Sequence, residues 1–156
     1  MRYKTDQQAR DAVRRWINPN AAGICCVVST AQVTDCSMSK AYHACKRAGR
    51  LDTSGMSISG HMQAMSELGY EAKLLGGGLS FEDPMSMTVN QAIKKYCEEG
   101  KTYVLYTRNH VITYRDGQVR DWHAETHANK AIRKRCESIY EMSKKTYVKY
   151  SEILEK

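Results

Sequence analysis

The segment NPNAAGICCVVSTAQVTDCSMSKAYHACKRAGR, from Asn18 to Arg50, predicts a loop, a buried helix, a tight turn and an amphipathic second helix. The small-residue loop ends at Gly23, and the apolar run that follows places Cys25 and Cys26 on the first turn of the buried helix. Unpaired backbone N–H groups and the positive end of the helix dipole lie at this turn. Both favour the reactive thiolate, so either cysteine is a candidate nucleophile.

The composition is that of one soluble globular domain spanning residues 1–156. The chain has 42% hydrophobic residues and is long enough to bury a core without cross-links. It shows no apolar run of membrane-spanning length and no signal peptide, so we expect no membrane partner. Six cysteines without an export signal indicate reduced thiols and a cytoplasmic location.

Helical patterns dominate the first half of the chain and strand patterns the second. Capping boxes at Thr5 and Thr88 each open a helix, Ser37 caps another, and residues 57–68 have helical spacing. We expect strands at 70–75, 101–107, 110–114 and 118–122, and a loop at the glycines 76–78. Residues 138–142 and 146–150 fit edge strands, although the pattern of the last dozen residues fits a helix equally well. Helices followed by an antiparallel sheet predict an α+β fold.

A predicted hairpin brings two further candidate residues together. His110 opens one strand, Asp116-Gly117 is a hairpin turn signal, and Asp121 ends the next strand. His110 and Asp121 occupy near-mirror positions about that turn, so their side chains can meet across the ladder. A cysteine hydrolase needs an imidazole near the thiolate and a group that holds the tautomer of that imidazole. The hairpin therefore complements the helix-borne thiol.

Three segments carry a resemblance to a known family: CCVVSTAQVTDCSMSKAYHACKRAGR, GMSISGHMQAMSELGY and TVNQAIKKYCEEGKTYVLYTRNHVITYRDGQVRDW. They resemble small papain-like cysteine peptidases that are common in bacteriophages and related to C39-type peptidases. The resemblance implies a papain-like cysteine proteinase fold with N-terminal helices packed on a C-terminal antiparallel sheet. It also implies that Cys25 is the nucleophile, His110 the general base and Asp121 the residue that orients the imidazole. Ungapped spacing back from residues 48–50 selects Cys25, and Cys26 remains the alternative.

The chain departs from the pattern of that family at three places. Asn109 stands where a glycine usually precedes the histidine, and Ile24 stands where an aspartate or asparagine often precedes the cysteine. The usual upstream glutamine of the oxyanion site is missing, and Asn20 is the nearest amide, a weak substitute. We therefore expect the oxyanion site to differ from that of the family.

The expected function is that of a thiol hydrolase or acyltransferase that cleaves an amide, isopeptide or thioester bond in a peptide or protein. It would need no metal and no organic cofactor, and would work in the cytoplasm of a phage host. Two alternatives stay open. Buried cysteines often serve only as small core residues, so the domain could be a scaffold that binds a host protein. The net charge of +7 and the bases between Lys130 and Lys145 also allow a nucleic-acid-binding domain.

Overall fold

The computed structural model describes residues 2–18, 21–78, 85–121 and 130–146. Its elements, in chain order, are α1 (Asp6–Arg14), α2 (Ile24–Thr34), α3 (Met38–Arg47), α4 (Ile58–Glu67), β1 (Tyr70–Gly77), α5 (Val89–Tyr96), β2 (Thr102–Thr107), β3 (His110–Arg115), β4 (Gln118–Arg120) and β5 (Ser138–Lys144). The domain is α+β, as predicted. Asn20 and nearly all of the strand expected at 146–150 lie outside the described residues.

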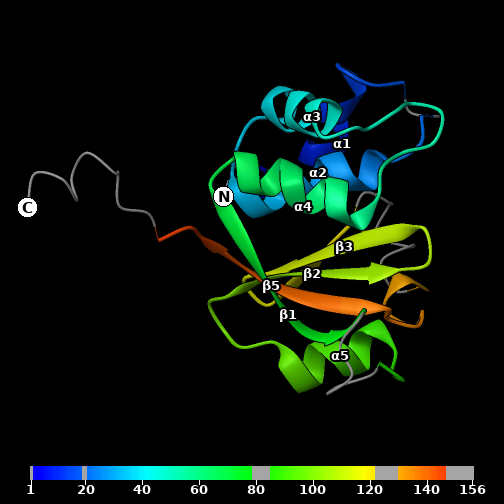
Figure 1. Ribbon diagram of the computed structural model, residues 1–156, viewed down its shortest axis with the longest axis vertical. Coiled ribbons are helices and arrows are strands. Elements are labelled where there is room, and N and C mark those ends of the chain that lie inside the picture. The colour runs from blue at the N-terminus through cyan, green and yellow to red at the C-terminus, as the bar shows by residue number, and fades with distance from the viewer. Residues whose placement is uncertain (1, 19–20, 79–84, 122–129, 147–156) are drawn as a thin grey trace, which may run out of the picture.

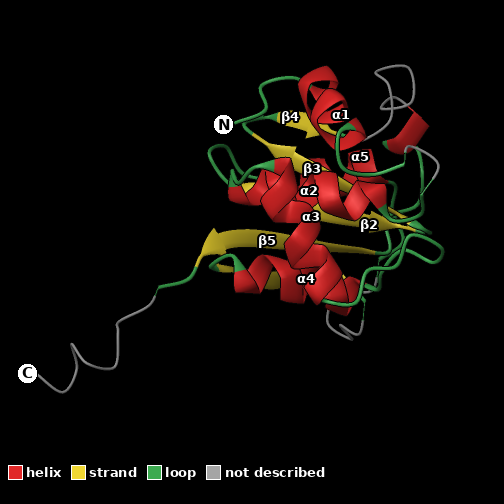
Figure 2. Cartoon of the chain, turned by 90° about the horizontal axis from the view of Figure 1, so that it is seen from above, coloured by secondary structure: helices red, strands yellow, loops and turns green. Residues whose placement is uncertain are grey.

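The strands form one antiparallel sheet of five, in the order β1-β5-β2-β3-β4. Helices α1 to α4 lie on one face of this sheet and α5 lies on the other (Figure 1). Seen from above, α2 and α3 run over the middle of the sheet and α4 lies towards its β1 side (Figure 2). Within the described ranges, no helix combines the length and apolarity needed to cross a bilayer.

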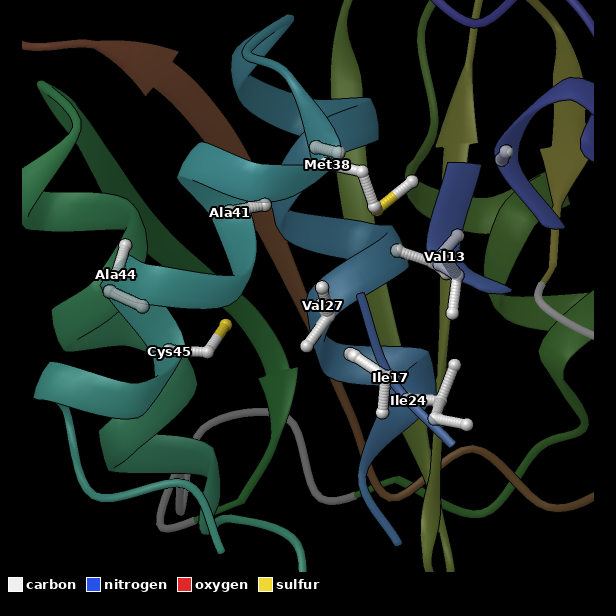
Figure 3. Packing of buried hydrophobic residues seen from close by; sticks show 12 residues of the cluster. Val13, Ile17, Ile24, Val27, Met38, Ala41, Ala44 and Cys45 are labelled. Carbon is white, nitrogen blue, oxygen red and sulfur yellow. The ribbon is translucent and has the colours of Figure 1, made fainter. Parts of the chain in front are cut away.

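Helix α2 is the buried centre of the helical layer. Nine of its residues are buried, in keeping with the apolar run predicted as the central helix. It begins after Gly23, whose φ of +73° suits glycine, and ends at Asp35, which also has a left-handed backbone with φ of +57°. Figure 3 shows Val27 of α2 among apolar side chains of α1 and α3, including Val13, Met38 and Ala41.

Two details of the sheet correct the predictions. Strand β5 is not an edge strand, because it lies between β1 and β2 and pairs with both. The glycines at 76 and 77 are not a loop: they end β1 and pair with Ile139 and Ser138. A Cβ on Gly77 would collide with the carbonyl oxygen of Glu137, so glycine lets the two backbones approach closely here.

Candidate active site

The helix start and the hairpin predicted from the sequence meet at one end of the sheet. Cys25 lies on the first turn of α2, and its thiol hydrogen-bonds to the imidazole of His110, the first residue of β3. His110 Nε2 lies 2.7 Å from Asp121 Oδ1. Nε2 is thus used by the carboxylate, which leaves Nδ1 as the ring nitrogen that faces the thiol.

The hairpin register explains how Asp121 reaches His110. Strands β3 and β4 pair Thr113 with Arg120, so Asp121 would stand opposite Ile112, two residues along from His110. The contact is therefore diagonal across the ladder, a distance that long or ring side chains can bridge. The Asp121 side chain is fully buried and that of His110 is 12% exposed, so little water screens the pair.

The two neighbouring thiols have different surroundings. Cys26 is buried in the apolar cluster between the helical layer and the sheet, where Val104, Tyr106 and Met142 surround it. Cys25 is more exposed and is the thiol that contacts His110. Both border the cleft, but only Cys25 has the imidazole as a hydrogen-bond partner within the described part of the chain.

The site favours a thiolate–imidazolium pair. The hydrogen bond from Cys26 comes first among the causes that lower the pKa of Cys25 to about 4; contacts with His110 and the Val111 N–H add to it, and burial opposes it. That same hydrogen bond and burial raise the pKa of Cys26. Burial alone would lower the pKa of His110, but Asp121 and Cys25 raise it to about 9. Between about pH 4 and about pH 9, therefore, Cys25 is a thiolate beside a protonated His110 ring.

A cleft of about 440 Å³ opens in front of the thiol. One wall comes from the helical layer and the loop before α4, with Gly23, Gly55, Met56 and Ile58 among its residues. The other comes from the ends of the central strands and the turn between β2 and β3, and is formed by Tyr106, Thr107, Asn109, His110, Val111 and Glu137. The thiol and the imidazole thus stand on opposite sides of an open groove.

Two polar contacts away from the site hold α2 in register with β3. Near the middle of the helix, Ser29 Oγ and Thr113 Oγ1 are 2.7 Å apart, and both side chains are buried. Beyond the last turn, Arg115 donates to both carboxylate oxygens of Asp35, at 2.9 and 2.8 Å, and to the carbonyl of Gln32 at 2.7 Å. Because hydrogen bonds are directional, these contacts set where Cys25 stands relative to His110.

Arg50 anchors the other end of α2. Its guanidinium is nearly fully buried, donates to the carbonyl of Ala22 at 2.5 Å and pairs with Asp52 at 2.6 Å. Its Nε lies 3.4 Å from the carbonyl of Gly23. A Cβ on Gly23 would lie 2.7 Å from the Cα of Gly55, so the loop before the thiol is packed closely against residues 51–55. Sequence reasoning used residues 48–50 only for spacing and missed this role.

The departures from the family pattern have local explanations. Asn109 has a φ of +62°, a left-handed backbone that glycine adopts most easily and asparagine tolerates. Ile24 is 3% exposed and belongs to the apolar core between the helices, where an ionised side chain would be costly. Because Asn20 lies outside the described residues, the nearest described oxyanion donor is the backbone N–H of Cys25, in a helix that has no side-chain cap.

A buried histidine behind the cleft was also missed. His61 of α4 is fully buried, and its Nδ1 lies 2.6 Å from the hydroxyl of Tyr106, which lines the cleft. Burial lowers the pKa of His61 to about 3, so its ring is neutral and the contact is a hydrogen bond between neutral groups. In the sequence, His61 is one of several residues on the apolar face of a predicted helix, and no neighbouring residue indicates its contact with Tyr106.

The basic residues considered for nucleic acid are divided by the fold. Those at 130–135 precede β5 and those at 144–145 end it, so the two groups lie about 20 Å apart along the strand. The ammonium of Lys145 binds the carbonyl and hydroxyl of Ser66. In the described part of the chain, no three His, Cys, Asp or Glu side chains gather as a metal site.

Comparison with known proteins adds no relative: no family model, no curated protein and no solved structure matches this chain. The arguments about function therefore rest on the residues and geometry of the chain.

Proposed function

We propose that this chain is a papain-like thiol hydrolase or acyltransferase that cleaves an amide, isopeptide or thioester bond through Cys25, His110 and Asp121. The observation that carries the proposal is the alignment of a thiol on a helix N-terminus, an imidazole and a buried carboxylate along one open cleft. A cysteine on the helical layer facing a histidine on the sheet is also the arrangement that the family resemblance leads one to expect. The phage origin and host cytoplasm implied by that resemblance belong to the same proposal.

The first half of the reaction forms an acyl-enzyme. The Cys25 sulfur donates an electron pair to the carbonyl carbon of the substrate, and the carbonyl π electrons move onto oxygen. The backbone N–H of Cys25 is placed to donate to that oxyanion. When the oxyanion collapses, the bond to the leaving amine or thiol breaks, and His110 gives its proton to the leaving atom. The product is a thioester on Cys25 and a neutral His110.

The second half regenerates the thiolate. Neutral His110 takes a proton from water, or from an acceptor amine or thiol, as that nucleophile attacks the thioester. Collapse of the second tetrahedral intermediate expels the Cys25 thiolate, and His110 is again protonated. Asp121 holds the ring so that Nδ1 faces the sulfur, and its negative charge stabilises the imidazolium. Water as acceptor gives hydrolysis, and an amine gives transfer.

Alkylation of the thiols tests the proposal. In the native protein, iodoacetamide should modify Cys25 at neutral pH far faster than any of the other five thiols, as mapped by mass spectrometry of the digested protein. The C25A variant should lose the fast phase. The C26A variant is the matched control, and should keep fast modification at residue 25 even if the rate changes.

Equal modification of all six thiols would overturn the proposal and favour the scaffold alternative. Fast modification of Cys26 in place of Cys25 would overturn the choice of nucleophile.

A further inference from the structure

Glu137 has an unusual place in the cleft. Among the described residues that line the cleft, it alone has a carboxylate and none is lysine or arginine, although the chain as a whole has a net charge of +7. Arg135, two residues earlier, directs its guanidinium to the carbonyl of Met85, at 3.4 Å. Among the described residues, no ion pair occupies the Glu137 side chain, which is exposed.

The sheet brings Glu137 to the same cleft wall as the imidazole. Thr107 pairs directly with His110 across β2 and β3. On the other side of β2, Tyr106 pairs with Ser138, and the N–H of Glu137, one residue earlier, donates to the carbonyl of Tyr106. His110, Thr107 and Glu137 therefore come from three neighbouring segments at one end of the sheet and form a row on the cleft wall. Two strand spacings, about 10 Å, separate the first from the last.

The backbone of Glu137 is held firmly in this row. Its N–H donates to the carbonyl of Tyr106 at 2.8 Å, and its carbonyl accepts from the N–H of Gly78 at 3.0 Å. The close approach of Gly77 fixes it from the same side. The side chain thus projects from a fixed position at a known place along the groove.

The middle of the row offers a second polar group. Thr107 is 4% exposed on the cleft wall, and its hydroxyl makes no hydrogen bond with any described residue. The hydroxyl oxygen has no surface open to the cleft in this conformation, so a polar group of a bound substrate would satisfy it once the side chain turns about χ1. Thr107 and Glu137 together thus form a small polar subsite beside the reacting groups.

We propose that Glu137 and Thr107 form a subsite for a cationic side chain, so that the substrate carries lysine or arginine close to the bond that is cut. The inference rests on the proposed thiol chemistry and names its substrate class. An extended chain advances about 3.3 Å per residue, so a row of about 10 Å places the cation within about two residues of the scissile carbonyl. The carboxylate accepts the charge-assisted hydrogen bonds, and the hydroxyl accepts or donates one more.

Covalent probes test the inference without knowledge of the natural substrate. A series of tripeptidyl acyloxymethyl ketones carries lysine, norleucine or glutamate at each of the two positions next to the reactive group, with alanine elsewhere. The readout is the second-order rate of Cys25 modification, expressed as the lysine-to-norleucine ratio within each variant. General changes in reactivity cancel in this ratio.

For the wild-type protein we expect a ratio of about five at one of the two positions, the scale of a partly exposed ion pair. E137Q should bring the ratio close to one, and E137K should favour the glutamate probe. T107V should lower the ratio by a smaller factor. E71Q, which removes an exposed carboxylate from β1 far from the cleft, should keep the wild-type ratio.

The outcomes separate the two proposals. Rapid modification of Cys25 with a ratio near one at both positions, or a ratio that E137Q leaves unchanged, would overturn the cationic subsite and leave the thiol chemistry standing. Modification no faster than that of the other thiols, for every probe, would overturn the proposed function itself.

Discussion

On one face of the sheet, α2 meets β3 through the polar pairs Ser29–Thr113 and Asp35–Arg115 in addition to apolar contacts, whereas on the other face α5 packs through apolar side chains such as Val89, Ile112 and Ile139. Apolar packing is non-directional and tolerates small shifts of one element over another. Hydrogen bonds between buried groups are directional and do not tolerate such shifts. The proposed active site lies on the face where hydrogen bonds fix the position of α2 on the sheet.

The pKa shifts follow the same division. On the α2 face, contacts between ionisable groups lower the pKa of Cys25 and raise that of His110. On the α5 face, burial raises the pKa of Cys136 to about 11 and that of Cys97 to about 12, which makes both thiols unreactive at neutral pH. Burial raises the pKa of a thiol, whereas hydrogen bonds from the neighbouring thiol and the imidazole lower the pKa of Cys25.

The largest expected effect is on stability and comes from the α5 face. Ile112 is fully buried there, so I112A should lower the free energy of unfolding by about 2–5 kcal/mol through lost burial and the cavity left behind. Urea denaturation followed by circular dichroism measures this change in the free energy of unfolding. The Cys25 alkylation rate of the folded fraction should stay that of the wild type, and a rate loss of tenfold or more would show that the two faces do not act separately.

The next effect is on reactivity. In the wild type, the alkylation rate should rise with a pKa of about 4 and stay flat through neutral pH, because the thiolate exists above that value. H110A should raise the pKa of Cys25, because the contact with His110 is lost while the hydrogen bond from Cys26 remains. At about pH 5 the rate should fall by up to about 30-fold, the value for a full return to an ordinary thiol, since higher intrinsic nucleophilicity offsets part of the lost thiolate.

Turnover of any substrate should also decline above about pH 9, where His110 loses the proton that the leaving group needs. C136A, which removes a buried thiol from the α5 face, serves as the control and should keep the wild-type pH profile. An H110A profile identical to that of the wild type would mean that the imidazole does not set the state of the thiol.

The smallest expected effects come from two variants that each remove one hydroxyl, one on each face of the sheet. T113V removes the partner of Ser29, whose hydroxyl can turn to the carbonyl four residues earlier, so the cost should be about 1 kcal/mol. Y103F removes the acceptor of the Glu98 N–H on the α5 face, at a similar cost. Of the two variants, only T113V should slow Cys25 alkylation, by about twofold to threefold, because Ser29–Thr113 joins α2 to β3 and the Tyr103–Glu98 contact does not. Equal Cys25 alkylation rates in T113V and Y103F would show that the Ser29–Thr113 pair does not position the thiol.

Local signals in the chain anticipated much of this molecule. The capping boxes at Thr5 and Thr88 and the cap at Ser37 are present because each needs only residues three positions away. The meeting of His110 and Asp121 was also predictable, since a single hairpin turn separates them. The two residues meet diagonally, and not directly opposite each other as their near-mirror positions suggested, because the turn and the short β4 set the pairing of the strands.

Residues whose role depends on distant partners escaped sequence reasoning. Arg50 acts on a loop nearly thirty residues before it, and His61 bonds to Tyr106, 45 residues later. The inner position of β5 was missed because the strand is amphipathic enough to suit an edge, and only its pairing with β1 and β2 shows otherwise.

Hydrophobic periodicity and turn chemistry, which act over a few residues, determined the elements, the α+β class, and the presence of a thiol at a helix start and an imidazole at a strand start. Tertiary structure alone decided which of two adjacent thiols meets the ring, and which carboxylate borders the cleft. The reason is that adjacent helix positions differ by about 100° in direction, and only the packed neighbours determine which direction faces the sheet.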